Sequence, residues 1–182
     1  VGLTQYLLLY CLLVPYLNID GIHTTLDYTH FFLFVLDTVL ITLSGNIIND
    51  IEDYEIDLIN RPETVFVSKH ISIKKAWILY GLVVDVGFIL ALYLAFYVNK
   101  LPLVLIYPAA VALLYFYSTL FKKKAIIGNV VVSFFCGGVA AIVLFAEKDA
   151  YAQLSEQTQN AAWLAFEAYA FFAFFTTMFR EI

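Results

Sequence analysis

An acidic segment between residues 49 and 57 carries the side chains best suited to chemistry. Asn49, Asp53 and Asp57 follow one another at four-residue intervals. In a helix, a four-residue step returns to within about 40° of the same face, so the three side chains would project as one stripe. Their amide and carboxylate oxygens suit Mg²⁺, which usually completes its coordination shell with waters and substrate phosphates. The segment therefore predicts a Mg²⁺ site that binds a phosphate-bearing substrate.

The rest of the chain must hold this stripe at a membrane. Of the 182 residues, 63% are hydrophobic and 14% are charged, whereas soluble domains are roughly 45–50% apolar and 25% charged. A span needs about 20 apolar residues. We therefore expect an all-α polytopic transmembrane bundle, one domain over residues 1–182, with a motif loop at residues 49–75. The six predicted spans are Val1–Ile19, Phe31–Ile48, Ala76–Val98, Leu101–Phe121, Ala125–Ala146 and Ala161–Phe179.

The basic residues predict the orientation of the bundle. Lys and Arg near span ends stay preferentially on the cytoplasmic side, and an alternation of six spans puts only Lys100 and Lys148 on the opposite side. The acidic stripe is therefore predicted to face the cytoplasm. The basic residues on its side are Arg61, Lys69, Lys74, Lys75, Lys122, Lys123, Lys124 and Arg180.

Composition also weighs against several other classes of function. The net charge is −5, and the few basic residues form no patch interleaved with aromatic residues, so nucleic acid is not an expected partner. Cys11 and Cys136 lie inside apolar runs, where cysteine behaves as a small hydrophobic residue. We expect neither a disulfide nor a metal site at these two positions.

Two further features have more than one interpretation. The run from Tyr117 to Lys124 ends the fourth span on the side of the acidic stripe. Its lysines are either ordinary positive anchors or charges that balance a bound diphosphate. Asp37 and Asp85 lie inside predicted spans, where ionisable groups are costly and often functional. They either carry a function or face the bundle and form hydrogen bonds. Glu167 is too close to the expected boundary of the sixth span to interpret.

Several short motifs accompany the stripe along the chain. They are Asn49, Asp50, Asp53 and Asp57, then Ile59-Asn60-Arg61-Pro62 and Ile71-Ser72; further along, Tyr117-Ser118, Lys122, Gly128-Asn129 and Arg180-Glu181-Ile182. Together they resemble the motifs of the UbiA superfamily of intramembrane prenyltransferases. The stripe matches the first aspartate-rich motif of that family in both spacing and place, at the cytoplasmic end of a second span. The resemblance covers essentially the whole chain.

The resemblance implies a fold of nine helices, of which six are present here. It also implies two facing aspartate-rich motifs, each of which binds a Mg²⁺ that grips one diphosphate. We expect the second motif beyond Ile182, so this fragment alone should be inactive. The residues carried over are Asn49, Asp53 and Asp57 as metal ligands, Asp50 as a supporting acid that faces sideways, and Lys122, Tyr117 and Arg61 as diphosphate-binding groups. Glu52 and Glu55 should be solvated.

The sequence departs from part of the family directly after Asn60. Many members that prenylate aromatic acids carry an Arg-Pro-Ile-Pro-like run, whereas Glu63 and Thr64 follow Pro62 here. This is similar to a bacterial and archaeal-lipid-like branch, often labelled geranylgeranylglycerol-phosphate geranylgeranyltransferases. The resemblance implies Mg²⁺-dependent transfer from a polyprenyl diphosphate, within a membrane that we expect to be the bacterial cell membrane. The acceptor is either the hydroxyl of a lipid precursor or the aromatic ring of a quinone precursor.

Two alternatives from other classes remain. A secondary transporter could use Asp37 and Asp85 for protons or coupling ions, since intramembrane carboxylates often do so. A noncatalytic membrane subunit would fit a chain that carries only the first aspartate-rich motif.

Overall fold

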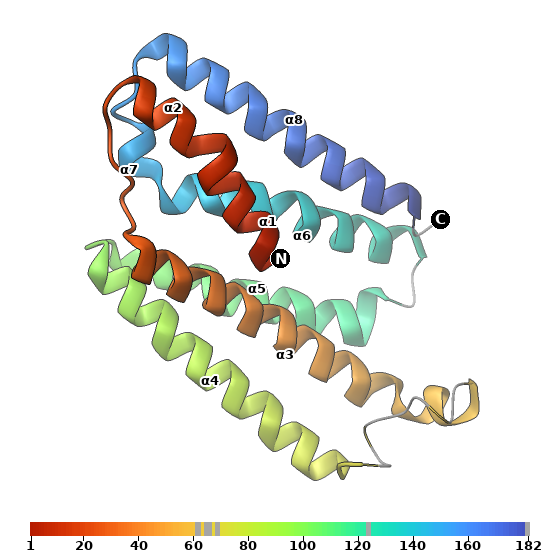
Figure 1. The fold of residues 1–182 in the computed structure, drawn as a ribbon. Coiled ribbons are helices and arrows are strands. Elements are labelled where there is room, and N and C mark those ends of the chain that lie inside the picture. The colour runs from red at the N-terminus through yellow and green to blue at the C-terminus, as the bar shows by residue number, and fades with distance from the viewer. Residues whose placement is uncertain (61–62, 64–66, 68–69, 123–124, 181–182) are drawn as a thin grey trace. The chain divides into compact units, whose positions relative to one another are not determined.

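The computed structural model describes residues 1–60, 63, 67, 70–122 and 125–180. Within these residues, all named secondary-structure elements are helices. An isolated β-bridge joins Val67 and Ile71. The chain forms two compact units (Figure 1). Unit 1 comprises Val1–Val35 and Ala125–Ile182, and unit 2 comprises Leu36–Lys124.

Six helices in the described residues are long and apolar enough to cross a membrane, as predicted. The fifth begins and ends where the sequence indicated, at Ala125 and Ala146. The sixth begins earlier than predicted, because Ser155 caps a polar first turn: its hydroxyl accepts the N–H of Thr158 at 3.4 Å. Glu167 therefore lies well inside this helix and not near its boundary.

Unit 1 holds the first span, the start of the second, and the last two spans. The first span is continuous but contains a π-helical segment. The elements are α1 (Gly2–Leu7), the π-helix Leu8–Leu13, α2 (Val14–Ile19), residues 28–35 of α3 (Tyr28–Asn60), α6 (Ala125–Ala146), α7 (Lys148–Tyr151) and α8 (Glu156–Arg180).

The main packing within unit 1 is between α6 and α8, which run side by side (Figure 1). Gly137 allows this close approach, since a Cβ there would lie 3.0 Å from the carbonyl oxygen of Ala170. Val143 on α6 and Ala162 on α8 are fully buried. Small residues at the contact bring helix backbones together, which favours van der Waals packing in a membrane.

A buried acid, Glu147, links two connecting segments of unit 1 through hydrogen bonds. Glu147 is 0% exposed, and its carboxyl oxygens accept the backbone N–H groups of Thr25 at 2.5 Å and Leu26 at 3.1 Å. The Thr25 hydroxyl in turn accepts the N–H of Ala150 at 3.2 Å. Burial raises the pKa of Glu147, although the two N–H bonds act in the opposite direction. The segment before α3 is thus fixed to the end of α6.

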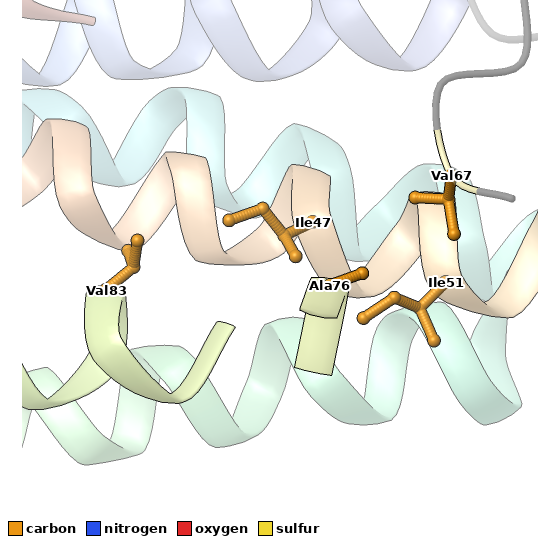
Figure 2. Close-up of a cluster of buried hydrophobic side chains, with 5 residues drawn as sticks. All are labelled: Ile47, Ile51, Val67, Ala76 and Val83. Carbon is orange, nitrogen blue, oxygen red and sulfur yellow. The ribbon is translucent and has the colours of Figure 1, made fainter. Parts of the chain in front are cut away.

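Unit 2 contains the remainder of α3, α4 (Ile73–Tyr97), a 3₁₀ turn at Leu101–Leu105, α5 (Ile106–Phe116) and the π-helix Tyr117–Phe121. Ser72 caps α4: its hydroxyl accepts the N–H of Lys75 at 3.4 Å. A buried hydrophobic cluster joins α3, α4 and the loop that connects them (Figure 2). Its members are Ile47, Ile51, Val67, Ala76 and Val83.

A tyrosine fills the contact between α4 and α5. Tyr107 is 2% exposed, and its hydroxyl occupies the space where a Cβ on Gly87 would lie. The same hydroxyl donates to the carbonyl of Val83 at 3.5 Å. Only glycine at position 87 leaves room for this ring.

Candidate functional site

The acidic stripe is helical throughout, because α3 continues beyond its apolar part as far as Asn60. Asn49, Asp53 and Asp57 are each half-buried, whereas Asp50 is exposed. Glu52 and Glu55 are also exposed, and Glu55 accepts a hydrogen bond from the hydroxyl of its neighbour Tyr54 at 2.7 Å. The half-buried members are thus the three that the four-residue spacing singled out.

Lys122 brings a positive charge onto this stripe from a helix far along the chain. Its ammonium group donates to Oδ1 of Asn49 at 2.7 Å and to Oδ2 of Asp53, with which it forms an ion pair. The side chain of Lys122 is 36% exposed and that of Asp53 is 21% exposed. The Lys122 ammonium group is therefore held between the amide oxygen of Asn49 and a carboxylate oxygen of Asp53 at the edge of the bundle.

Two local features of unit 2 bring Lys122 to α3. Gly45 allows close approach, since a Cβ there would lie 3.1 Å from a methyl carbon of Leu114 on α5. The end of α5 then widens into a π-helix, in which the N–H of Lys122 bonds to the carbonyl of Tyr117 at 2.8 Å. Short π-helical turns of this kind occur frequently at functional sites.

The other acids of the segment share the same electrostatic environment. The carboxyl of Asp50 lies within electrostatic range of Asp53, Asp57 and Lys122. It therefore adds negative charge beside the pair even though it is exposed. Three carboxylates against one ammonium leave the site with an excess of negative charge, which favours a further cation.

The donor set fits the predicted Mg²⁺. Asn49 and Asp53 already direct two hard oxygen atoms at one cation, the Lys122 ammonium, and Mg²⁺ is commonly bound by one or two carboxylates plus substrate phosphates. Within the described ranges, no three Asp, Glu, His or Cys side chains converge closely enough to hold a metal without further ligands. Two oxygen atoms therefore converge here, and a metal bound at this point would need its remaining ligands from elsewhere.

The other residues predicted to bind the diphosphate are Tyr117 and Arg61. Tyr117 supplies its backbone carbonyl to the π-helical turn, and its side chain is half-buried. Arg61 lies outside the described residues, as do Lys123 and Lys124.

Sequence reasoning did not single out Tyr107, which lies in the neighbourhood of two intramembrane acids. Its hydroxyl lies within electrostatic range of both Asp37 and Asp85. Oδ1 of Asp37 is buried and has no hydrogen-bond partner in the structure, whereas Asp85 is exposed along a groove of about 340 Å³ between α4 and α5. No motif around Tyr107 could have indicated this, because the contact depends on how α3, α4 and α5 pack.

The fold and the site together define a membrane-embedded helical protein with an acidic stripe that pairs with Lys122 at the end of a span. Comparison with known families makes this more specific. Residues 7–182 match the model of the UbiA prenyltransferase family. The chain belongs to that family.

Similar proteins are named digeranylgeranylglyceryl phosphate synthase. The protein of Methanobrevibacter smithii is 32% identical over 145 residues, which are 76% of this chain and 46% of that protein. The protein of Metallosphaera sedula is 39% identical over 125 residues (63% and 41%), and that of Methanothermobacter thermautotrophicus is 38% identical over 96 residues (53% and 32%). The chain thus spans between about a third and a half of these relatives. No solved structure matched the chain.

Proposed function

We propose that the parent protein transfers a polyprenyl group from its allylic diphosphate to the hydroxyl of a glycerol phosphate lipid precursor, with Mg²⁺, at the cytoplasmic face of the membrane. The observation that carries the proposal is that the side chains of Asn49 and Asp53 both bind the Lys122 ammonium group. Family membership supports prenyl transfer. The names of the relatives support a glycerol phosphate acceptor over an aromatic ring.

In this proposal the stripe binds the leaving group. Asn49, Asp53 and Asp57 would hold Mg²⁺, which when bound would neutralise charge on the diphosphate oxygens. Without substrate, Lys122 balances the carboxylates. With substrate, its ammonium would turn toward the diphosphate as a compact point charge. Tyr117 and Arg61 would add contacts, and Asp50 would strengthen the attraction for the cation.

The reaction then follows from charge. The bond between the allylic carbon and the diphosphate oxygen breaks, and both electrons leave with the diphosphate. The positive groups of the site stabilise the charge that develops on that oxygen. The acceptor oxygen forms an ether bond to the allylic carbon and loses its proton to the released diphosphate. Apolar surfaces of the complete helical bundle would have to exclude water, which would otherwise capture the allyl cation.

The test is an assay of prenyl transfer in the full-length protein with Asp53→Asn, Asp57→Asn and Lys122→Met. Glu52→Gln is the matched control, since Glu52 lies in the same turns of α3 but is exposed and outside the stripe. Loss of a group that stabilises transition-state charge typically lowers the rate about 10²–10³-fold. Retention of normal transfer by both aspartate variants would reject the assignment, and transfer only to an aromatic acceptor would reject the acceptor.

A further inference from the structure

A second cavity lies in unit 1, away from the acidic stripe in the sequence and built from different helices. It is a groove of about 750 Å³ along α6 and α8. Seven of the fifteen residues that line it are aromatic. Three of these rings remain open: Phe134 is 64% exposed, Trp163 55% and Phe171 54%. The groove is therefore a preformed apolar channel on the surface of the helix pair.

Small residues on α6 create the groove. Gly137 is in contact with α8, whereas a Cβ on the adjacent Gly138 would meet no atom within 4 Å. Gly138, together with Ala141, therefore leaves an open floor opposite the aromatic side chains of α8. From Phe134 to Lys148 the groove follows α6 for about 20 Å, at 1.5 Å per residue. An extended hydrocarbon chain has a suitable shape for this space.

Two charged side chains give the groove a polarity. Lys148 lines one end, directly after the membrane-spanning part of α6, and is exposed. Glu167 lines the groove from α8, well inside that span, and is also exposed. A phosphate is attracted to the lysine end by its charge, and the carboxylate of Glu167 would repel the same phosphate from a deeper position.

We propose that this groove is a binding site for an anionic phospholipid of the leaflet that borders α7. The headgroup phosphate contacts the Lys148 ammonium, and one acyl chain lies over Gly138 between the aromatic walls. Lipids in general cover any transmembrane surface, but a site needs both a fixed channel and a charge that selects the headgroup. The groove and Lys148 supply these two features together, and this proposal is independent of the proposed reaction.

The test is photocrosslinking of the full-length protein in nanodiscs that contain phosphatidylglycerol with a diazirine in one acyl chain. Peptide mass spectrometry then locates the adducts. We expect adducts on residues that line the groove. We expect about a fivefold or greater decrease for Lys148→Glu, since one basic residue contributes about a factor of five to the attraction of an anionic lipid. Gly138→Leu should produce a similar decrease by filling the floor.

Two matched controls separate a specific site from general effects. Lys74→Glu makes the same charge change at an exposed position of unit 2, and Gly81→Leu makes the same change at another glycine whose Cβ would meet no atom within 4 Å. Neither should alter the groove adducts, and thermal unfolding checks that all variants fold. Unchanged adducts in both groove variants would overturn the proposal. So would labelling by a diazirine prenyl diphosphate in place of phosphatidylglycerol, or protection of the groove from both probes.

Discussion

Substitution of the buried Glu147 provides a sharp test of how unit 1 is held together. Its carboxyl accepts two backbone N–H groups, those of Thr25 and Leu26. Glu147→Gln keeps one acceptor oxygen and turns an amide NH₂ toward the other N–H, which then has no acceptor. A buried donor left in this way costs about 1–3 kcal/mol. Glu147→Ala leaves both donors without acceptors and should destabilise the protein further.

The assay is thermal unfolding of the full-length protein in detergent. A loss of about 1–3 kcal/mol should lower the Tm of the full-length protein by a few degrees, since the shift per kcal/mol decreases as the chain becomes longer. Glu156→Gln is the control: it removes the same charge from an exposed position in the first turn of α8 and should cost only about 0.3–1 kcal/mol through the helix dipole. Equal effects of the glutamine variants at positions 147 and 156 would refute the reasoning.

The pH dependence of the same variant gives a second readout. Burial raises the pKa of Glu147 above its ordinary value of 4.5. A carboxyl with a raised pKa contributes stability below the unfolded-state pKa, and that contribution is lost as the pH rises through the folded-state value. The Tm difference between wild type and Glu147→Gln should therefore decrease as the pH rises from about 4. A difference that grows with pH would contradict the assignment of burial as the dominant cause.

Further predictions concern unit 2. Lys122→Met should change the free energy of unfolding by less than about 1 kcal/mol, since the ion pair of Lys122 is partly exposed. The same variant should bind a prenyl diphosphate at least about tenfold more weakly. A direct titration measures this affinity, and an unchanged affinity would count against a role of Lys122 in binding. Gly87→Leu should destabilise the protein by about 1–3 kcal/mol through overpacking against Tyr107. Gly81→Leu should have little effect because its Cβ would meet open space, and similar Tm values for the two leucine variants would contradict this packing.

The sequence predicted the spans well, because apolar runs of membrane length leave little choice of structure. Ala125–Ala146 was predicted to the residue. The start of α8 was missed because five polar residues, Glu156 to Asn160, form helix beyond the apolar run, with Ser155 as their cap. Hydropathy does not detect such a turn.

For the candidate site, the sequence predicted the helical stripe and named Lys122, but not the direct contact between them. That contact depends on the close approach at Gly45 and on the π-helical turn after Phe116. Neither has a sequence signal as clear as the four-residue spacing. Glu147 and Tyr107 were missed for a similar reason, since their partners lie far away in the chain and only packing brings them together.

The central claim is that the stripe on α3 binds a diphosphate through Mg²⁺. Its most direct test is calorimetric titration of the full-length protein with a non-reactive prenyl diphosphate analogue, with Mg²⁺ and with chelator, for wild type, Asp53→Asn and the Glu52→Gln control. We expect tight binding by wild type and by the control only when Mg²⁺ is present, and a loss of about tenfold or more for Asp53→Asn. Binding that is independent of Mg²⁺ and equal in all three proteins would contradict the claim.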